Sequence, residues 1–269
     1  MSTAQLLALE AGVVLALVSA LWAVSVAVRD TSIVDVFWGS GFVVVAWVGF
    51  ALGDGSGGRD LLLALLVTVW GLRLTAHLAR RNLGKGEDYR YVEMRRRHGA
   101  GWPLRSLFVV FWLQGALMWT VSLPLQVAPA AGSAGPGALV PAGIALWAIG
   151  FGFEGVGDLQ LTRFKADPAN RGKVMDRGLW RYTRHPNYFG DFCAWWGIWL
   201  VALAAGAAWW TAAGPALMSV LLVRVSGVAL LERSLVERRE GYADYVARTS
   251  AFFPWPPRAA SKGLASRRR

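Results

Sequence analysis

Residues 177–191 bring together side chains that bind anions and side chains that exchange protons. The segment reads Arg-Gly-Leu-Trp-Arg-Tyr-Thr-Arg-His-Pro-Asn-Tyr-Phe-Gly-Asp and stands at the start of a long apolar run. Guanidinium groups bind phosphates through paired, charge-assisted hydrogen bonds. The phenol of Tyr182 and the imidazole of His185 are candidate catalytic groups, because such side chains serve as general acids and bases. The segment therefore indicates recognition of a phosphorylated ligand beside proton-transfer groups.

Pro186 indicates where the next helix begins. Proline disfavours helical backbone at the preceding residue and suits the first turn of a helix, so we expect a helix to start at Pro186 or Asn187. The N–H groups at its start form a ready anion site, and Arg177, Arg181 and Arg184 stand beside it. The alternative is an interfacial belt, in which the aromatic residues of this segment anchor at lipid headgroups and the arginines set topology.

Ionisable side chains also occur inside apolar runs, where they are expensive and point to function. They are Asp35, Arg73, His77, Glu154, Asp191 and Arg224. Arg73 and His77 are four residues apart, so they share one face of a helix. The set favours a polar cavity at one side of a membrane. Mutual neutralisation, for example of Arg73 by Asp35, is the alternative for any one pair.

Transmembrane helices are the elements that must position these residues. A span needs about 20 largely apolar residues, and such windows cover 6–28, 33–52, 61–79, 107–127, 138–156, 188–209 and 212–231. We therefore expect an all-α polytopic membrane protein with about seven helices in one bundle. A single membrane-embedded domain is expected over residues 1–257, followed by a basic, disordered tail over 258–269 that attracts membrane lipids.

The charge is distributed unevenly along the chain. The net charge is +11 and the pI about 10.6, although 55% of residues are hydrophobic and only 17% charged. Basic residues concentrate in 80–105, in 158–187 and beyond 232, which seven spans place on one side, and the positive-inside rule makes that side cytoplasmic. We expect an inner-membrane protein with its N-terminus outside and its cavity open to the cytoplasm. Nucleic-acid binding is disfavoured, and the single cysteine, Cys193, excludes a disulfide framework and a Cys-based zinc site.

Residues 178–191 resemble the signature of the bacterial branch of the steroid 5α-reductase family, often labelled DUF1295. Three further segments fit that branch: Val-Asp-Val-Phe-Trp-Gly at 34–39, residues 70–74 with 80–88, and the ending 231–257. The resemblance covers nearly the whole chain. It implies a membrane reductase of seven helices that holds NADPH on its cytoplasmic side. The expected substrate is lipid-like, with a carbon–carbon double bond conjugated to a carbonyl.

The resemblance also implies cofactor positions. They are Asn82 and Lys85 after the third span, Asp158, Lys165 and Lys173 in the loop after the fifth, and Tyr182, Asn187 and Asp191 around the sixth. To these we add further charged or polar side chains near the same loops, namely Arg73, Arg163, Arg181, Arg184, His185 and Glu232. A dinucleotide with a pyrophosphate and a 2′-phosphate needs such cations, and it supplies the hydride chemistry itself.

Asp35 loosely matches a family glutamate that hydrogen-bonds the substrate carbonyl. We expect desolvation in the second span to keep Asp35 protonated, so that it donates to the substrate oxygen. The resemblance also implies a tyrosine partner on the third span, but that position falls at or near Gly71 and the span contains no tyrosine. Trp38 and Phe42 share a helix face with Asp35, so they either line the substrate site or simply pack.

Two rival functions remain. Residues 184–190, followed by two spans and Leu231-Glu232, also resemble isoprenylcysteine carboxyl methyltransferase, where His185, Tyr188 and Glu232 would surround S-adenosylmethionine. That ligand lacks phosphates and does not need so many cations. The second rival is a lipid-binding or scaffolding membrane protein without catalytic activity. The sequence does not determine the oligomeric state or the substrate, and it calls for no metal.

Overall fold

The computed structural model describes residues 1–53, 57–82, 84–131, 135–225 and 241–258. Within these ranges all regular elements are helical, apart from one isolated bridge between Thr183 and Ser250. Five helical segments are long and apolar enough to cross a membrane, namely Thr3–Val28, Ile33–Leu52, Gly58–Asn82, Tyr89–Val121 and Leu139–Ala166. The expected all-α class of a multi-pass membrane protein is therefore confirmed.

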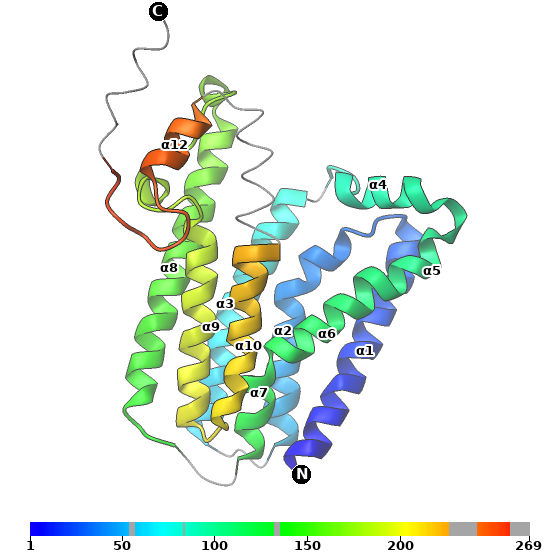
Figure 1. Cartoon of the computed structure of the whole chain (residues 1–269). Helices are drawn as coiled ribbons and strands as arrows, with labels where there is room; N and C mark the ends of the chain where they lie inside the picture. Colours follow the sequence, from blue (N-terminus) through cyan, green and yellow to red (C-terminus); the bar gives the residue numbers. More distant parts are fainter. Residues whose placement is uncertain (54–56, 83, 132–134, 226–240, 259–269) are drawn as a thin grey trace, which may run out of the picture. The chain divides into compact units, whose positions relative to one another are not determined.

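The chain forms two compact units, and the first contains Met1–Trp147 and Trp196–Leu217. Its helices are α1 (Thr3–Val28), α2 (Ile33–Leu52), α3 (Gly58–Asn82), α4 (Tyr89–His98), α5 (Trp102–Ser106), α6 (Leu113–Val121) and α7 (Leu123–Val127) (Figure 1). The first three match the predicted windows closely.

A pair of glycines brings α2 and α3 together. A Cβ atom at Gly39 would collide with the carbonyl oxygen of Gly71, and one at Gly71 would collide with that of Gly39. Small residues of this kind let the backbones of membrane helices approach closely. On either side of this contact, Ser40 and Thr75 share a hydrogen bond of 2.9 Å and the rings of Phe42 and Trp70 pack edge to face at 5.8 Å. This close pairing fixes the ends of α2 and α3, where candidate residues lie.

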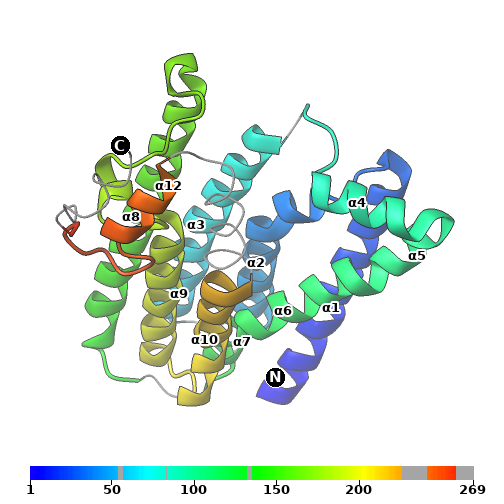
Figure 2. The same cartoon turned by 45° about the horizontal axis from the view of Figure 1, so that its top comes forward.

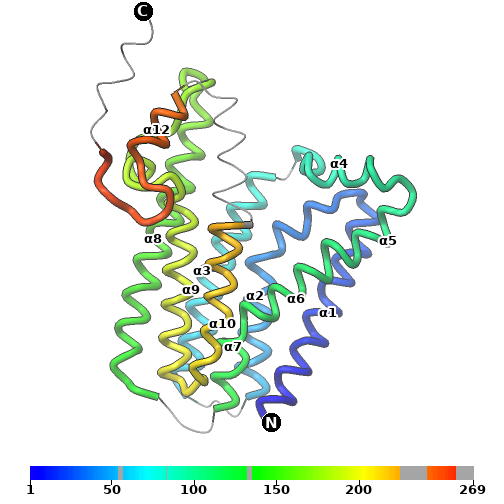
Figure 3. The backbone as a smooth tube through the Cα atoms, in the orientation of Figure 1, coloured from blue at the N-terminus to red at the C-terminus, as the bar shows by residue number. Residues whose placement is uncertain are grey.

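The fourth predicted span is not one regular helix. A π-helical stretch, Leu107–Trp112, joins α5 to α6, and the backbone breaks at Ser122 before α7. Pro124 lies in the first turn of α7, where a missing N–H costs little. The tube in Figure 3 follows this irregular course. Upstream, the basic segment expected as a loop contains α4, which both views place beside the connection between α1 and α2 (Figures 1 and 2).

The second unit contains Ala148–Trp195 and Met218–Arg269. Two long helices contribute to both units: α8 (Leu139–Ala166) and α9 (Pro186–Ala204). The same is true of α10 (Ala213–Val220), which a π-helical stretch, Leu221–Val225, follows, while α12 (Tyr242–Arg248) lies in the second unit alone. The remainder of the seventh predicted window and residues 259–269 lie outside the described residues.

Helices α8 and α9 also meet at glycines. Within the second unit, a Cβ atom at Gly150 would collide with the carbonyl oxygen of Gly190, and one at Gly190 with that of Gly150. Helix α9 begins at Pro186, as predicted, and the carbonyl of His185 accepts the N–H of Phe189 at 3.0 Å. Because α8 continues to Ala166, the residues expected in a loop before that point are helical instead.

Candidate functional site

In the first unit, two short connections are joined by hydrogen bonds. The connection between α1 and α2 supplies Thr31 and Ser32, and the one between α3 and α4 supplies Glu87 and Asp88. The N–H of Thr31 donates to Glu87 Oε1 at 2.7 Å, and the N–H of Asp88 donates to Ser32 Oγ at 2.7 Å. Ser32 Oγ in turn donates to Asp30 Oδ1 at 2.7 Å. These bonds hold the start of α4 against the start of α2.

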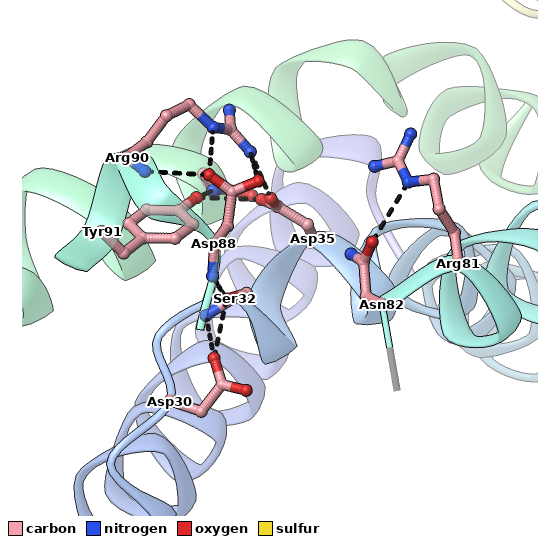
Figure 4. A network of polar contacts seen from close by, with 9 residues as sticks. Asp30, Ser32, Asp35, Arg81, Asn82, Asp88, Arg90 and Tyr91 are labelled. Carbon is pink, nitrogen blue, oxygen red and sulfur yellow. Dashed lines mark hydrogen bonds and ion pairs between the residues drawn. The ribbon is translucent and has the colours of Figure 1, made fainter. Parts of the chain in front are cut away.

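Asp35, in the first turn of α2, lies at the centre of a polar network (Figure 4). Arg90 Nη2 donates to Asp35 Oδ2 at 2.8 Å, and the hydroxyl of Tyr91 donates to Asp35 Oδ1 at 2.9 Å. Arg90 Nε also donates to Asp88 Oδ1 at 2.9 Å, so its guanidinium bridges two carboxylates. Gln114 Nε2 completes the set at 3.4 Å from the Tyr91 oxygen. The buried phenol is therefore held from two sides.

Two carboxylates of the α3–α4 connection are stabilised in their charged form. Burial alone would raise the pKa of Glu87, but the hydrogen bonds and charge of Arg95, with the hydrogen bonds of Thr31, bring it below its ordinary value. Arg95 binds Glu87 through both Nη2, at 2.7 Å, and Nε, at 3.0 Å. Burial likewise opposes ionisation of Asp88, and the hydrogen bonds and charge of Arg90 lower its pKa. Both groups are anionic at neutral pH.

A cavity of about 320 Å³ opens beside this network. Its lining includes Asn82 and Lys85, two of the positions assigned to the cofactor, together with Asp30, Ser32 and Asp88. Three carboxylates and one ammonium line it, so this cavity is acidic and not the phosphate-binding basic patch that its sequence suggested. Acidic walls suit hydroxyl and amide donors, or a cationic ring, better than a phosphate. Ser32 and Asp88 belong both to the cavity and to the network around Asp35.

The structure corrects two expectations about α2. Asp35 does not stand in an apolar setting, because Arg90 and Tyr91 donate hydrogen bonds to its two oxygens. Its partner is Arg90 and not Arg73. Phe42 is fully buried and packs edge to face on Trp38 at 5.2 Å, so we assign it to helix packing and not to a substrate surface.

Tyr91, the most buried member of this network, was not among the residues predicted from the sequence. Tyr91 lies on a short amphipathic helix after the third span, not within that span, where the family pattern placed a tyrosine. Helix α4 begins with Asp88 as its N-cap, whose side chain accepts the N–H of Arg90 at 2.9 Å. That cap, followed by Tyr91 on the buried face, is the feature from which the helix could have been predicted.

In the second unit, the motif at 178–185 is held by the segment that ends the chain's described part. Gly178 starts the motif with a left-handed backbone, φ 57°, which only glycine adopts freely. The carbonyl of Trp180 accepts the Tyr245 hydroxyl, and Thr183 Oγ1 donates to the carbonyl of Phe252 at 2.7 Å. The N–H of Trp255 donates to the carbonyl of Tyr182 at 3.0 Å.

Arg184 has a structural role that the sequence did not predict. It is buried, its backbone N–H donates to the carbonyl of Ser250 at 2.9 Å, and its Nη1 donates to the carbonyls of Val246, at 3.1 Å, and Thr249. These carbonyls lie at the C-terminal end of α12, whose partial negative charge a cation stabilises. The structure therefore gives Arg184 a helix-capping role, and its assignment to the cofactor stays a prediction.

Asn187 and Asp158, two positions that the resemblance assigns to the cofactor, lie together. Asn187 Nδ2 donates to Asp158 Oδ1 at 3.3 Å, across the contact between α9 and α8. The side-chain oxygen of Asn187 is buried and has no hydrogen-bond partner among the described residues, and such a group is costly unless a ligand or water satisfies it. His185, one of the proposed catalytic groups, is buried and stacks in parallel on Tyr188 at 5.3 Å. This corner of the unit combines a buried amide acceptor, a carboxylate and an imidazole.

Comparison with known proteins identifies the family of this chain. A family described as "Protein of unknown function (DUF1295)" matches residues 21–249. The chain belongs to the DUF1295 family. "Uncharacterized protein C594.04c" of Schizosaccharomyces pombe is 27% identical over 261 residues, which cover 87% of this chain and 75% of that protein. No solved structure matches the chain.

The DUF1295 match extends over both compact units, and the remaining predicted cofactor residues are divided between them. Arg73 lies half-buried on α3 in the first unit. In the second, Arg163 and Lys165 are exposed on α8 and not in a loop, Lys173 and Arg181 are exposed, Tyr182 is partly exposed, and Asp191 is half-buried on α9. Glu232 lies outside the described residues. Among the described residues of this DUF1295 member, no group of three or more His, Cys, Asp or Glu could hold a metal ion.

Proposed function

We propose that this DUF1295 protein is a membrane-embedded reductase that uses NADPH to reduce a carbon–carbon double bond conjugated to a carbonyl in a lipid-like substrate. One observation carries the proposal. Asn82 and Lys85, which match family cofactor positions, line a cavity that shares Ser32 and Asp88 with the Asp35–Tyr91 network. The surface assigned to the cofactor therefore lies next to the Asp35–Tyr91 pair, which could polarise a substrate carbonyl, within the first unit.

Each compact unit, taken by itself, offers groups that fit part of a nicotinamide dinucleotide. The acidic cavity beside Asn82 offers acceptors for ribose hydroxyls or a carboxamide. In the second unit, the buried side-chain oxygen of Asn187 has no donor in the described part of the chain, and a carboxamide or hydroxyl group would supply one. The cofactor, when bound, supplies the hydride that reduces the double bond.

Tyr91 is the group that we assign to the substrate carbonyl, in place of a protonated Asp35. The developing enolate needs a hydrogen-bond or proton donor at its oxygen. Asp35 and Gln114 hold the phenol in place, and its O–H can turn from Asp35 to a substrate oxygen without moving the ring. The Arg90 guanidinium lies 5.4 Å from the centre of the Tyr91 ring and would stabilise negative charge that develops there. Asp35 becomes a positioning residue.

A ligand titration tests the proposal. The full chain in detergent is titrated separately with NADPH, NADH and S-adenosylmethionine while its thermal unfolding is followed, because a ligand of the native state raises the midpoint. We expect a rise with NADPH. We also expect Asn187→Leu to lose most of that rise, whereas Gln5→Leu, which removes an exposed amide at the start of α1, keeps it.

The same titration separates the rival functions. A rise with S-adenosylmethionine alone would overturn the reductase in favour of a methyltransferase that resembles isoprenylcysteine carboxyl methyltransferase. No rise with any of the three would leave a lipid-binding or scaffolding protein. If NADPH raises the midpoint, the substrate class is then defined by testing which lipid-like enones cause NADPH to be consumed. The absorbance of NADPH measures this consumption.

A further inference from the structure

A second cavity, distinct from the one beside Asn82, lies between α12 and the segment that follows it. It measures about 280 Å³, and its lining includes Arg184, Arg248 and Arg258 together with Thr249, Ser250 and Trp255. All these residues belong to the second unit, so the cavity is formed within one compact body. The chain turns back on itself here, because the N–H of Arg258 donates to the carbonyl of Arg248 at 2.9 Å. That bond brings two arginines to one wall.

The charge around this cavity is strongly positive. Three of its lining residues are arginines, and none of its described lining residues is acidic. Arg184 lines the cavity as well, and its Nη1 donates to the backbone carbonyls of Val246 and Thr249. Arg248 forms an ion pair with Asp176 at 3.0 Å, and Asp176 is not among the residues that line the cavity. Like charges gathered around one hollow repel each other, and a bound anion relieves that repulsion.

Exposed aromatic side chains stand on the same segment. Trp255, which lines the cavity, is 70% exposed, and Phe253, two residues earlier, is 60% exposed. Large exposed aromatic residues are costly in water but are favoured at the level of lipid headgroups. In a multi-pass membrane protein, such a pair next to a basic cavity matches a lipid whose headgroup is anionic and whose chains lie among apolar groups.

We propose that this cavity binds the phosphate of an anionic phospholipid, with Arg248 and Arg258 as the principal contacts and Arg184 at its base. Guanidinium groups donate two parallel hydrogen bonds to a phosphate, which an ammonium cannot do. Trp255 and Phe253 would lie in the interfacial layer beside the bound headgroup. The site is independent of the proposed reductase activity, since it uses neither the cavity beside Asn82 nor the Asn187–Asp158 pair.

The test uses the full chain in neutral detergent, titrated with mixed micelles that contain phosphatidylglycerol, with micelles that contain phosphatidylcholine, and with inorganic phosphate alone. Thermal unfolding reports binding. We expect phosphatidylglycerol to raise the midpoint and phosphatidylcholine to leave it unchanged. Arg258→Gln should weaken the apparent affinity at least about tenfold, the loss expected for one charge-assisted hydrogen bond.

Arg258→Gln is chosen because only the backbone of Arg258 contributes to the fold in the described part of the chain, so the variant should remain folded. Arg97→Gln is the matched control, since it removes an exposed guanidinium on α4 in the other unit. Equal weakening in both variants would overturn the site and indicate general charge attraction. A full shift with inorganic phosphate alone would overturn the lipid and indicate a soluble phosphate compound. NADPH binding is measured in parallel, so its failure leaves this result unaffected.

Discussion

Replacing Tyr91 by phenylalanine tests the network around Asp35 most directly. The change removes a hydroxyl that donates to Asp35 Oδ1 at 2.9 Å and leaves the buried ring in place. A hydrogen bond to a charged group contributes about 1.5–3 kcal/mol. Asp35 keeps its ion pair with Arg90, but Arg90 is 50% exposed, so solvent screens that pair. We expect a loss of about 1.5 kcal/mol, near the lower bound, and a fall of about 3–6 °C in the unfolding midpoint.

The same variant should also lose activity if Tyr91 serves the substrate carbonyl. Removing one donor to a developing oxyanion lowers turnover by about 10²–10³, while the NADPH-induced rise in the midpoint should stay close to that of the wild type. Thermal unfolding and NADPH consumption with an active enone measure the two effects. Tyr89→Phe is the stability control, because Tyr89 is two residues away on α4 and 80% exposed.

Two results would refute this reasoning. If Tyr91→Phe and Tyr89→Phe unfold at the same temperature as the wild type, the phenol does not hold Asp35. If Tyr91→Phe is destabilised but retains full turnover, the network is structural and another group polarises the carbonyl.

Three further predictions concern stability. Arg184→Met should lower the free energy of unfolding by about 2–3 kcal/mol, because it leaves carbonyls at the end of α12 without their donor. Limited proteolysis should then cut the variant near α12. An unchanged digestion pattern would contradict the capping role. Gly71→Ala should lower the unfolding midpoint through its collision with Gly39, at a cost of about 1–3 kcal/mol, whereas Gly12→Ala meets no atom within 4 Å and should be neutral or stabilising. The pKa values of Glu87 and Asp88 are lowered in the folded protein, so both carboxylates contribute their full stability above their ordinary pKa values of 4.5 and 3.8. That stability is lost as the pH falls through the lowered pKa values. The thermal unfolding midpoint should therefore fall in acid, and Glu87→Gln should reduce that fall.

Features encoded by local patterns were predictable from the sequence. The apolar windows located the first three helices, since burial in lipid requires about 20 apolar residues whatever the tertiary fold. Pro186 located the start of α9, because proline restricts both its own backbone and that of the residue before it. Segments that carry the family resemblance also contact one another in the structure. Residues 34–39 contact the glycine at 71, and residues 178–185 contact the ending at 245–255.

Features that depend on tertiary partners could not be predicted. Asp35 lies in an apolar window, and only the position of α4 shows that Arg90 and Tyr91 reach it. Arg177, Arg181 and Arg184 lie close together in one motif, and the sequence does not distinguish them. Arg184 alone among the three is buried against the carbonyls of α12. The end of α8 was also misplaced, because its charged last turns carry no hydropathy signal although they continue the helix to Ala166.

The helix-capping role of Arg184 affects how variants of this protein should be interpreted. A genetic screen that scores only loss of product would select changes at Arg184 and at Asn187 alike, although the first removes a structural support and the second a buried acceptor that we assign to a ligand. Protein abundance in the membrane distinguishes them, since cells degrade chains whose folding is impaired. A map of tolerated substitutions across residues 177–191 therefore needs a measurement of protein abundance for each variant before any position there is assigned to ligand binding.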